Sequence, residues 1–140
     1  MANHLVTNVG VYALIIKDKK LLLLHKPNDS IWTALGGRMN EHEKNIEEAL
    51  LREVKEEIGS DVIIGDILDV KLWSTNRKDH RLGIFYVCKL KGNGKIKLSR
   101  EHDDFKFFSH EELIEMSHKE KRGKSGRELF NKLKEKRIIN

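Results

Sequence analysis

Three glutamates in one short segment are the clearest sign of chemistry in the sequence. Glu53, Glu56 and Glu57 lie in segment 52–59, which reads REVKEEIG. In a helix, which turns by about 100° per residue, these carboxylates would share an arc of about 100° with apolar side chains. Carboxylates in such surroundings repel one another and resist the loss of water, and a bound divalent cation would relieve both costs. Because no His or Cys partners the cluster, a hard ion such as Mg²⁺ or Mn²⁺ suits it, with a solvated helix face as the alternative.

Local signals predict the helix that would carry these glutamates over 46–58. Asn45 is a good N-cap, and Glu48 stands three residues later, as a capping box requires. Gly59 stands where a glycine commonly ends a helix. The pair Gly36-Gly37 lies upstream of this helix, in a segment where the backbone can adopt conformations that other residues cannot.

The remaining elements are predicted from hydrophobic patterns and turn residues. Strands are expected at 9–16, 21–24, 62–73, 82–90, 95–98 and 105–108, with a hairpin turn at 92–94. Two further helices are expected at 109–117 and 127–136. This order predicts a single α/β domain over 1–140, in which a mixed β-sheet is sandwiched between helices as α/β/α layers.

The composition is that of one folded domain. The chain has 140 residues, of which 39% are hydrophobic, and this argues against disorder. Cys88 is the single cysteine, which excludes an internal disulfide and a multi-cysteine zinc site. We therefore expect a reducing, cytoplasmic setting. No apolar stretch approaches the roughly 20 residues of a membrane-spanning helix, so no membrane association is expected.

The net charge of +5 is concentrated at the C-terminus. Residues 119–140 hold nine Lys or Arg and three Glu, so the rest of the chain is nearly neutral. This basic tail is interpreted as an amphipathic helix. Binding to nucleic acid is a weaker alternative, because the tail has no interleaved aromatic residues apart from Phe130.

The segment from the glycine pair to Gly59 resembles the signature of the Nudix (MutT-like) hydrolase family. That signature reads Gly, five residues, Glu, seven residues, Arg-Glu, an aliphatic residue, any residue, Glu-Glu, any residue and Gly. Gly37 and Glu43 match its first half, and segment 52–59 matches its second half in full. The chain departs by one extra residue between Glu43 and Arg52, and by Leu35 where a proline is common. With the flanking strands and the segment 107–113, the resemblance covers about residues 5–117.

The resemblance implies the Nudix fold and the hydrolysis of a nucleoside diphosphate linked to another moiety, with Mg²⁺ or Mn²⁺. Glu53, Glu56 and Glu57 match the metal-binding positions, and the carbonyl of Gly36 matches the usual backbone ligand. Arg52 matches the arginine that orients the catalytic glutamate, and it could also form a salt bridge to Glu43 or Glu56. The general base is either a glutamate of the signature or an acid of a later loop. That loop offers three acids, of which the third is preferred: Glu101, Asp103 and Asp104.

Contacts to the substrate are predicted at three positions near the signature. Trp32 could stack on a base, while Arg38 and Lys26 could contact phosphates, with ordinary surface cations as the alternative for both. Three other aromatic residues are interpreted as core rather than as base-stacking residues: Trp73, Phe85 and Tyr86.

The substrate class is approached by elimination. Markers of Nudix subfamilies that act on ADP-ribose, dinucleoside polyphosphates and NADH are absent from the sequence. This leaves a (deoxy)nucleoside triphosphate or nucleotide-sugar pyrophosphohydrolase. The alternative is a catalytically silent Nudix-like domain that senses a nucleotide. The extra residue and the absence of the common proline at Leu35 favour that alternative, and the intact Arg52 and glutamates oppose it. A homodimer is expected only by analogy with the family.

Overall fold

The computed structural model describes residues 3–74, 80–121 and 124–140 of the chain. Its elements run in the following order: β1 (Asn8–Lys17), β2 (Lys20–Lys26), β3 (Ile31–Thr33), β4 (Leu35–Arg38), α1 (Ile46–Ile58), β5 (Val62–Ser74), β6 (His80–Leu90), β7 (Asp104–Phe108), α2 (His110–Lys119) and α3 (Lys124–Glu135). Among these residues, no helix is both long enough and apolar enough to cross a membrane.

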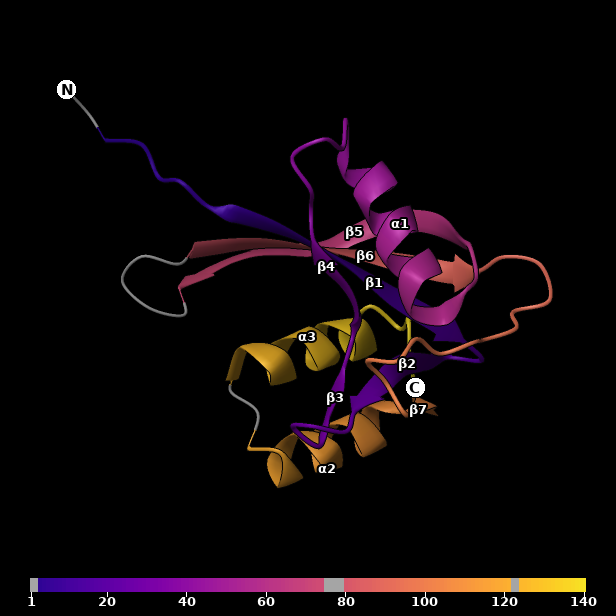
Figure 1. Ribbon diagram of the computed structural model, residues 1–140. Coiled ribbons are helices and arrows are strands. Elements are labelled where there is room, and N and C mark those ends of the chain that lie inside the picture. Colours follow the sequence, from indigo (N-terminus) through magenta and orange to yellow (C-terminus); the bar gives the residue numbers. More distant parts are fainter. Residues whose placement is uncertain (1–2, 75–79, 122–123) are drawn as a thin grey trace.

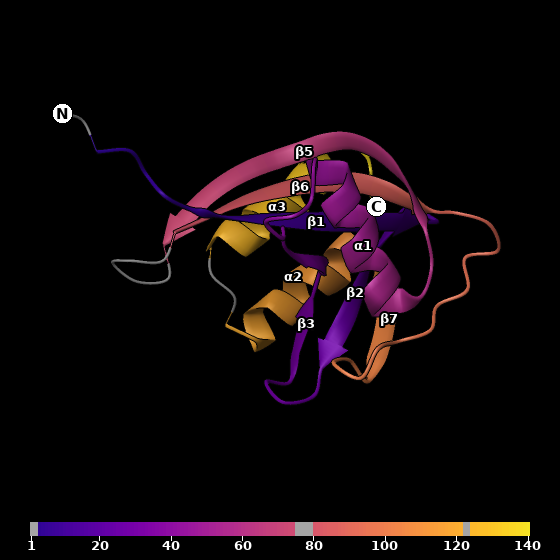
Figure 2. The same ribbon diagram turned by 45° about the horizontal axis from the view of Figure 1, so that its top comes forward.

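The strands form one mixed sheet in the order β3-β2-β1-β6-β5, with β4 paired to β1 and β7 paired to β2. Strands β1 and β6 run parallel, whereas β1 and β4 are antiparallel. Helix α1 covers one face of the sheet, and α2 and α3 cover the other (Figures 1 and 2). The predicted α/β fold with helices on both faces is therefore confirmed.

Strand β1 separates two hydrophobic cores because its successive side chains point to opposite faces. Val11, Ala13 and Ile15 pack with the buried side of α1. Leu14 instead packs with residues of α2 and α3 on the other face. Both faces of this strand are covered, which explains its nearly continuous apolar sequence.

The predicted strand at 95–98 is wrong. The segment between β6 and β7 returns past the end of α1 (Figure 2). There the Lys97 N–H donates to the Ile58 carbonyl at 2.8 Å, and the Ser99 N–H donates to the Glu57 carbonyl at 3.0 Å. A helix leaves its last carbonyls without internal partners, and this segment satisfies two of them instead of pairing with a strand.

Two short strands, β3 and β4, were not predicted. Strand β4 contains Gly36 and Gly37, which are not typical strand residues. It forms because Tyr12 and Val11 of β1 supply its pairing partners across the sheet. Long-range pairing therefore overrides the local preference.

The basic C-terminal segment is an integral layer of the fold. Helix α3 begins at Lys124, earlier than the predicted 127, and ends at Glu135. Leu129, Phe130 and Leu133 are buried against the sheet and α2, and Ile139 beyond the helix is buried as well. Glu128 and Lys132 of this helix lie within ion-pair distance of Lys71 and Asp69 on β5, so this segment is both basic and part of the core.

We expect Leu133→Ala to lower the free energy of unfolding by about 2–5 kcal/mol, because it removes a fully buried side chain from α3. Urea unfolding followed by circular dichroism measures the change. The matched control is Lys134→Ala, an exposed position on the same helix, for which a change within about 0.5 kcal/mol is expected. Equal effects of the two substitutions would contradict a structural role for α3.

Candidate active site

Helix α1 begins and ends where its local sequence predicts. The Asn45 side chain accepts a hydrogen bond from the Glu48 N–H at 2.8 Å, and Gly59 ends the helix with a φ of 67°. Helix α1 runs without a break from Ile46 to Ile58. The helix therefore presents Arg52, Glu53 and Glu57 in an undisturbed register.

The guanidinium of Arg52 is the centre of the polar network on α1. Its Nε and Nη2 donate to the two Glu43 carboxylate oxygens at 2.8 and 3.0 Å. Its Nη1 lies 3.2 Å from Glu56 Oε1 and 3.1 Å from Glu53 Oε1. Its Nη2 also donates to the Arg38 carbonyl at 3.0 Å, which ties β4 to the helix. Both predicted salt bridges of Arg52 are thus present despite the extra residue.

These contacts change the acidity of the groups involved. The hydrogen bonds from Arg52 hold the pKa of Glu43 below its usual value, and the same bonds raise the pKa of Arg52. Burial raises the pKa of Glu53, with Arg52 opposing the shift. Arg52 therefore remains charged and stabilises the carboxylates around it.

Glu57 is the most deeply buried acid of the acidic cluster formed by Glu53, Glu56 and Glu57. Its side chain is only 9% exposed, and its Oε1 accepts a hydrogen bond from the Gly36 N–H at 2.7 Å. Burial raises the pKa of Glu57 to about 8, although the Gly36 bond opposes the shift. The nearby charges of Glu53 and Glu101 raise it further, and Lys26 lowers it. A carboxyl group with such a raised pKa has too little positive charge nearby to stabilise its ionised form.

The two glycines allow the backbone of β4 to approach the carboxylates. Gly36 has a φ of 144°, and a Cβ at this position would clash with the Val11 carbonyl oxygen. A Cβ on Gly37 would lie 2.6 Å from Glu53 Oε1. Gly36 is thus required by its close approach to β1, and Gly37 by its close approach to the Glu53 carboxylate.

The donors on α1 and β4 fit a hard divalent cation. They are carboxylate oxygens of Glu53, Glu56 and Glu57 beside the Gly36 backbone, and oxygen is the donor that Mg²⁺ and Mn²⁺ prefer. A cation would also supply the charge that the buried Glu57 lacks. Within the described residues, no three acidic, imidazole or thiol side chains already converge on one point. Glu56 is hydrogen-bonded to Arg52 and Glu57 to Gly36.

The loop before β7 places its three acids differently. Asp103 Oδ1 lies 2.7 Å from His25 Nδ1. Asp104 Oδ1 accepts a hydrogen bond from the N–H of Phe105, the next residue. Glu101 contributes to the raised pKa of Glu57 and is therefore electrostatically close to the cluster. The sequence alone could not predict which of these three acids lies closest to Glu57.

The predicted substrate contacts are also dispersed. Lys26, at the end of β2, is half-buried and acts on the pKa of Glu57. Arg38 is exposed at the end of β4. Trp32 packs its ring against His25 and Phe108, at centroid distances of 5.0 and 5.1 Å. The structure thus places Lys26 electrostatically close to Glu57, joins the Arg38 carbonyl to Arg52, and packs the Trp32 ring away from both.

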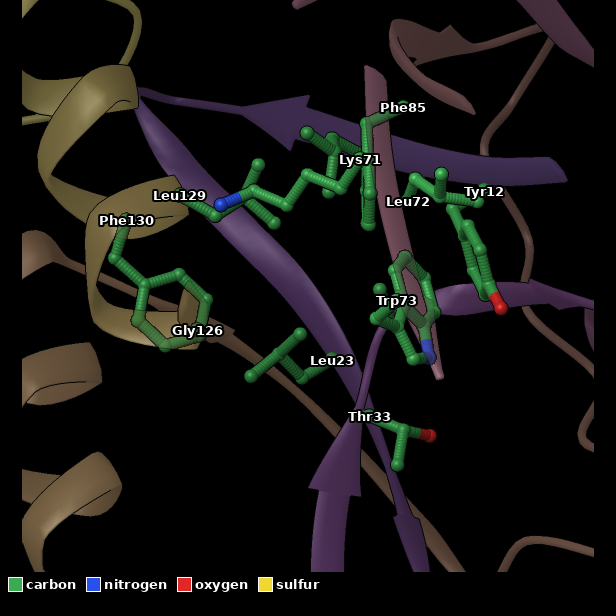
Figure 3. A pocket seen from close by; sticks show the side chains of 12 residues that line it. Tyr12, Leu23, Thr33, Lys71, Leu72, Trp73, Phe85, Gly126, Leu129 and Phe130 are labelled. Atoms are coloured by element: carbon green, nitrogen blue, oxygen red, sulfur yellow. The ribbon is translucent and has the colours of Figure 1, made fainter. Parts of the chain in front are cut away.

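A cavity of about 640 Å³ opens on the face of the sheet opposite α1 (Figure 3). Tyr12 and Phe85 stack at its wall with ring centroids 4.9 Å apart, and Trp73 and Phe130 add further aromatic surface. Thr33 and Ala34 line it from the strand segment that leads directly into the glycine pair. Ala34, which lines the cavity, is therefore separated from Gly36 by a single residue of the chain.

Three aromatic residues were predicted as core, and two of them line this cavity. That prediction is confirmed for Tyr86, which packs under α1. Phe85 and Trp73 pack against the opposite core but also line the cavity. An apolar strand pattern cannot distinguish a filled core from a cavity wall, so the sequence carried no signal for this site.

Comparison with known proteins identifies the family. The NUDIX domain matches residues 6–132. Nucleoside triphosphatase NudI of Escherichia coli O139:H28 (strain E24377A / ETEC) is 27% identical over 118 residues, covering 74% of this chain and 83% of that protein. The crystal structure of MutT protein from Methanosarcina mazei Go1 has a TM-score of 0.76 at 26% identity, covering 93% of this chain and 94% of that chain. UDP-X diphosphatase shares the fold, with a TM-score of 0.76 at 22% identity over 96% of this chain and 66% of that chain.

The chain belongs to the NUDIX domain family. The resemblance drawn from the sequence and the enzyme class that it implied, a Nudix pyrophosphohydrolase, are thereby confirmed. Members of this family generally use a divalent metal, which agrees with the oxygen donors on α1.

The raised pKa of Glu57 predicts how stability depends on pH in metal-free buffer. Because the folded protein binds this proton more tightly than the unfolded chain, the stability that it contributes is complete below the ordinary value of 4.5 and is lost as the pH rises towards about 8. Glu57→Gln stays neutral, so we expect it to gain about 1–4 kcal/mol of unfolding free energy over the wild type between pH 5 and 9.

Urea unfolding in the presence of EDTA at several pH values measures this difference. Glu48→Gln, at an exposed position of the same helix, is the control for the loss of one charge. A constant difference between Glu57→Gln and the wild type across the pH range would show that Glu57 does not titrate in this window.

Proposed function

We propose that the protein hydrolyses a phosphoanhydride bond in a nucleoside diphosphate-linked compound, with a (deoxy)nucleoside triphosphate or a nucleotide sugar as substrate and Mg²⁺ or Mn²⁺ as the metal. The observation that carries the proposal is the buried Glu57 carboxylate, hydrogen-bonded to Gly36 beside Glu53 and the Arg52 network. This arrangement concentrates negative charge where a polyanionic substrate could bind only with a cation. The 27% identity with a nucleoside triphosphatase supports the triphosphate as substrate.

In this proposal, Glu53, Glu56, Glu57 and the Gly36 carbonyl hold the metal. When bound, the metal neutralises phosphate charge and makes a bound water more acidic. Arg52 orients the glutamates, as its contacts to Glu53 and Glu56 support.

Lys26 and Arg38 contribute positive charge towards the phosphates. The influence of Lys26 on the pKa of Glu57 supports its place beside the metal ligands. For the general base, the loop offers Asp104, the residue preferred from the sequence, and Glu101. The electrostatic proximity of Glu101 to Glu57 favours Glu101.

The cavity opposite α1 would hold the nucleoside. Its aromatic walls, with Tyr12 stacked on Phe85 and Trp73 nearby, offer faces on which a base can stack (Figure 3). Because Ala34 lines the cavity two residues before Gly36, a nucleoside there would direct its phosphates towards the glycine pair. The cavity replaces Trp32 as the proposed base-binding site.

The geometry of the site does not support the alternative function, a catalytically silent Nudix-like domain that senses a nucleotide. Its main argument was the extra residue between Glu43 and Arg52. The two-bond pairing of Glu43 with Arg52 is nevertheless intact, and Arg52 also contacts Glu53 and Glu56 on α1. Loss of turnover with retained nucleotide binding would revive this alternative.

We expect Mg²⁺- or Mn²⁺-dependent release of phosphate or pyrophosphate from a panel of dNTPs, oxidised dGTP, nucleotide sugars, ADP-ribose and dinucleoside polyphosphates. Glu56→Gln should lower kcat by about 100-fold or more, because it removes a proposed metal ligand. Glu48→Gln on the opposite side of α1 is the matched control and should retain activity. Equal activity of Glu56→Gln and the wild type, or turnover unaffected by EDTA, would refute the proposal.

The cavity generates a separate expectation for substrate binding. Trp73→Leu should raise KM for the preferred nucleotide by about 5–50-fold with a smaller change in kcat, because stacking on an aromatic face contributes about 1–3 kcal/mol. Steady-state kinetics measures both constants. The matched control is Phe105→Leu, an exposed aromatic position on β7 that does not line the cavity. An unchanged KM for Trp73→Leu would place the base elsewhere.

A further inference from the structure

The His102 side chain is buried beside the acidic cluster without a hydrogen-bond partner. It is only 1% exposed, and its Nε2 lies 3.7 Å from Glu57 Oε2. Among the described residues, neither of its ring nitrogens has a hydrogen-bond partner. A buried polar group without a partner costs about 1–3 kcal/mol, so its presence calls for a physical explanation.

The backbone fixes this imidazole relative to the helix that carries Glu57. The His102 N–H donates to the Ser99 carbonyl at 3.3 Å, and the Ser99 N–H donates to the Glu57 carbonyl at 3.0 Å. The Lys97 N–H donates to the Ile58 carbonyl at 2.8 Å. The loop is thus fastened to the last turn of α1, and His102 and Glu57 are held as one unit.

The two oxygens of Glu57 have different surroundings. Oε1 accepts the Gly36 N–H at 2.7 Å, whereas Oε2 faces His102 Nε2. The 3.7 Å between His102 Nε2 and Glu57 Oε2 exceeds the usual N–H···O hydrogen-bond distance, about 3.0 Å, by less than an ångström. A small side-chain rotation would therefore let the imidazole donate to Oε2.

Other charged groups near Glu57 do not replace this contact. Lys26 and Glu101 act on its pKa, and Glu53 lies on the same helix. In the part of the chain that the structure describes, none of these three lies within ion-pair or hydrogen-bond distance of Glu57, whereas Gly36 and His102 do. The imidazole is thus the side chain placed to orient Oε2.

We propose that His102 is a positioning residue that orients the Glu57 carboxylate for metal binding by donating a hydrogen bond to Oε2. The inference rests on the proposed function, because it takes Glu57 as a metal ligand. Partners of this kind commonly change metal affinity by about 10–100-fold when removed.

Direct binding of Mn²⁺ to the metal-free protein, measured by electron paramagnetic resonance without nucleotide, tests the inference. His102→Leu fills the space but cannot donate, and we expect it to raise Kd for Mn²⁺ by about tenfold or more. His102→Gln places its amide nitrogen near the position of Nε2 and should stay within about threefold of the wild type. His102→Asn is too short to reach Oε2 and should behave like the leucine variant.

The controls separate positioning from stability. His25→Gln alters a neighbouring imidazole that pairs with Asp103, and it should leave Kd for Mn²⁺ unchanged. Urea unfolding of each variant reports on the fold. If His102→Leu does not fold, the comparison of His102→Gln with His102→Asn tests the positioning role. Both variants carry a polar amide, but the asparagine side chain is too short to contact Oε2. Once Glu57→Gln is present, adding His102→Leu should raise Kd no further.

The possible failures are distinguishable. If the wild type binds Mn²⁺ and Glu57→Gln weakens binding, but His102→Leu and His102→Asn bind like the wild type, the positioning role is overturned and the metal site stands. Equal weakening by His102→Gln and His102→Asn would also overturn it. If the wild type does not bind Mn²⁺, or Glu57→Gln has no effect, the metal site itself fails and the inference falls with it.

Discussion

The pairing of one guanidinium with several carboxylates is the interaction on which the site depends. Arg52 makes two hydrogen bonds to Glu43, lies near Glu53 and Glu56, and also donates to the Arg38 carbonyl. These contacts join the loop before α1, the helix and β4 into one unit. Without the fixed positive charge, the acids would repel one another across a partly buried surface. The network therefore keeps the negative charge concentrated while leaving the helix intact.

The sheet supplies the second constraint by bringing backbone against these acids. Strand β4 can pair with β1 and still approach Glu53 because Gly36 and Gly37 have no side chains. Thr33 and Ala34, which directly precede β4, line the aromatic cavity on the opposite face. A compound that spans the cavity and the acidic cluster would thus follow a single stretch of chain. The two sides of the sheet contribute to one proposed site through this short strand.

Much of the fold could be predicted from the sequence wherever the determinants are local. The limits of α1 were predicted at 46–58 and are observed there, because Asn45 and Gly59 act on the backbone within a few residues. The segment 95–98 was predicted as a strand and failed, because its hydrogen-bond partners are the last carbonyls of α1. The strand containing Gly36 was missed for the converse reason, since its pairing to β1 comes from a distant part of the chain.

The sequence by itself determined the acidic helix, the register of Arg52 with the glutamates and the NUDIX domain family. Those features depend on spacing along one helix, which a linear pattern records directly. Only the tertiary structure decided that His102 lies beside Glu57, that Glu101 is near the cluster, and that Phe85 lines a cavity. Each of these depends on how the sheet and loops bring distant segments together, and the same residue types could equally have filled a core or faced water.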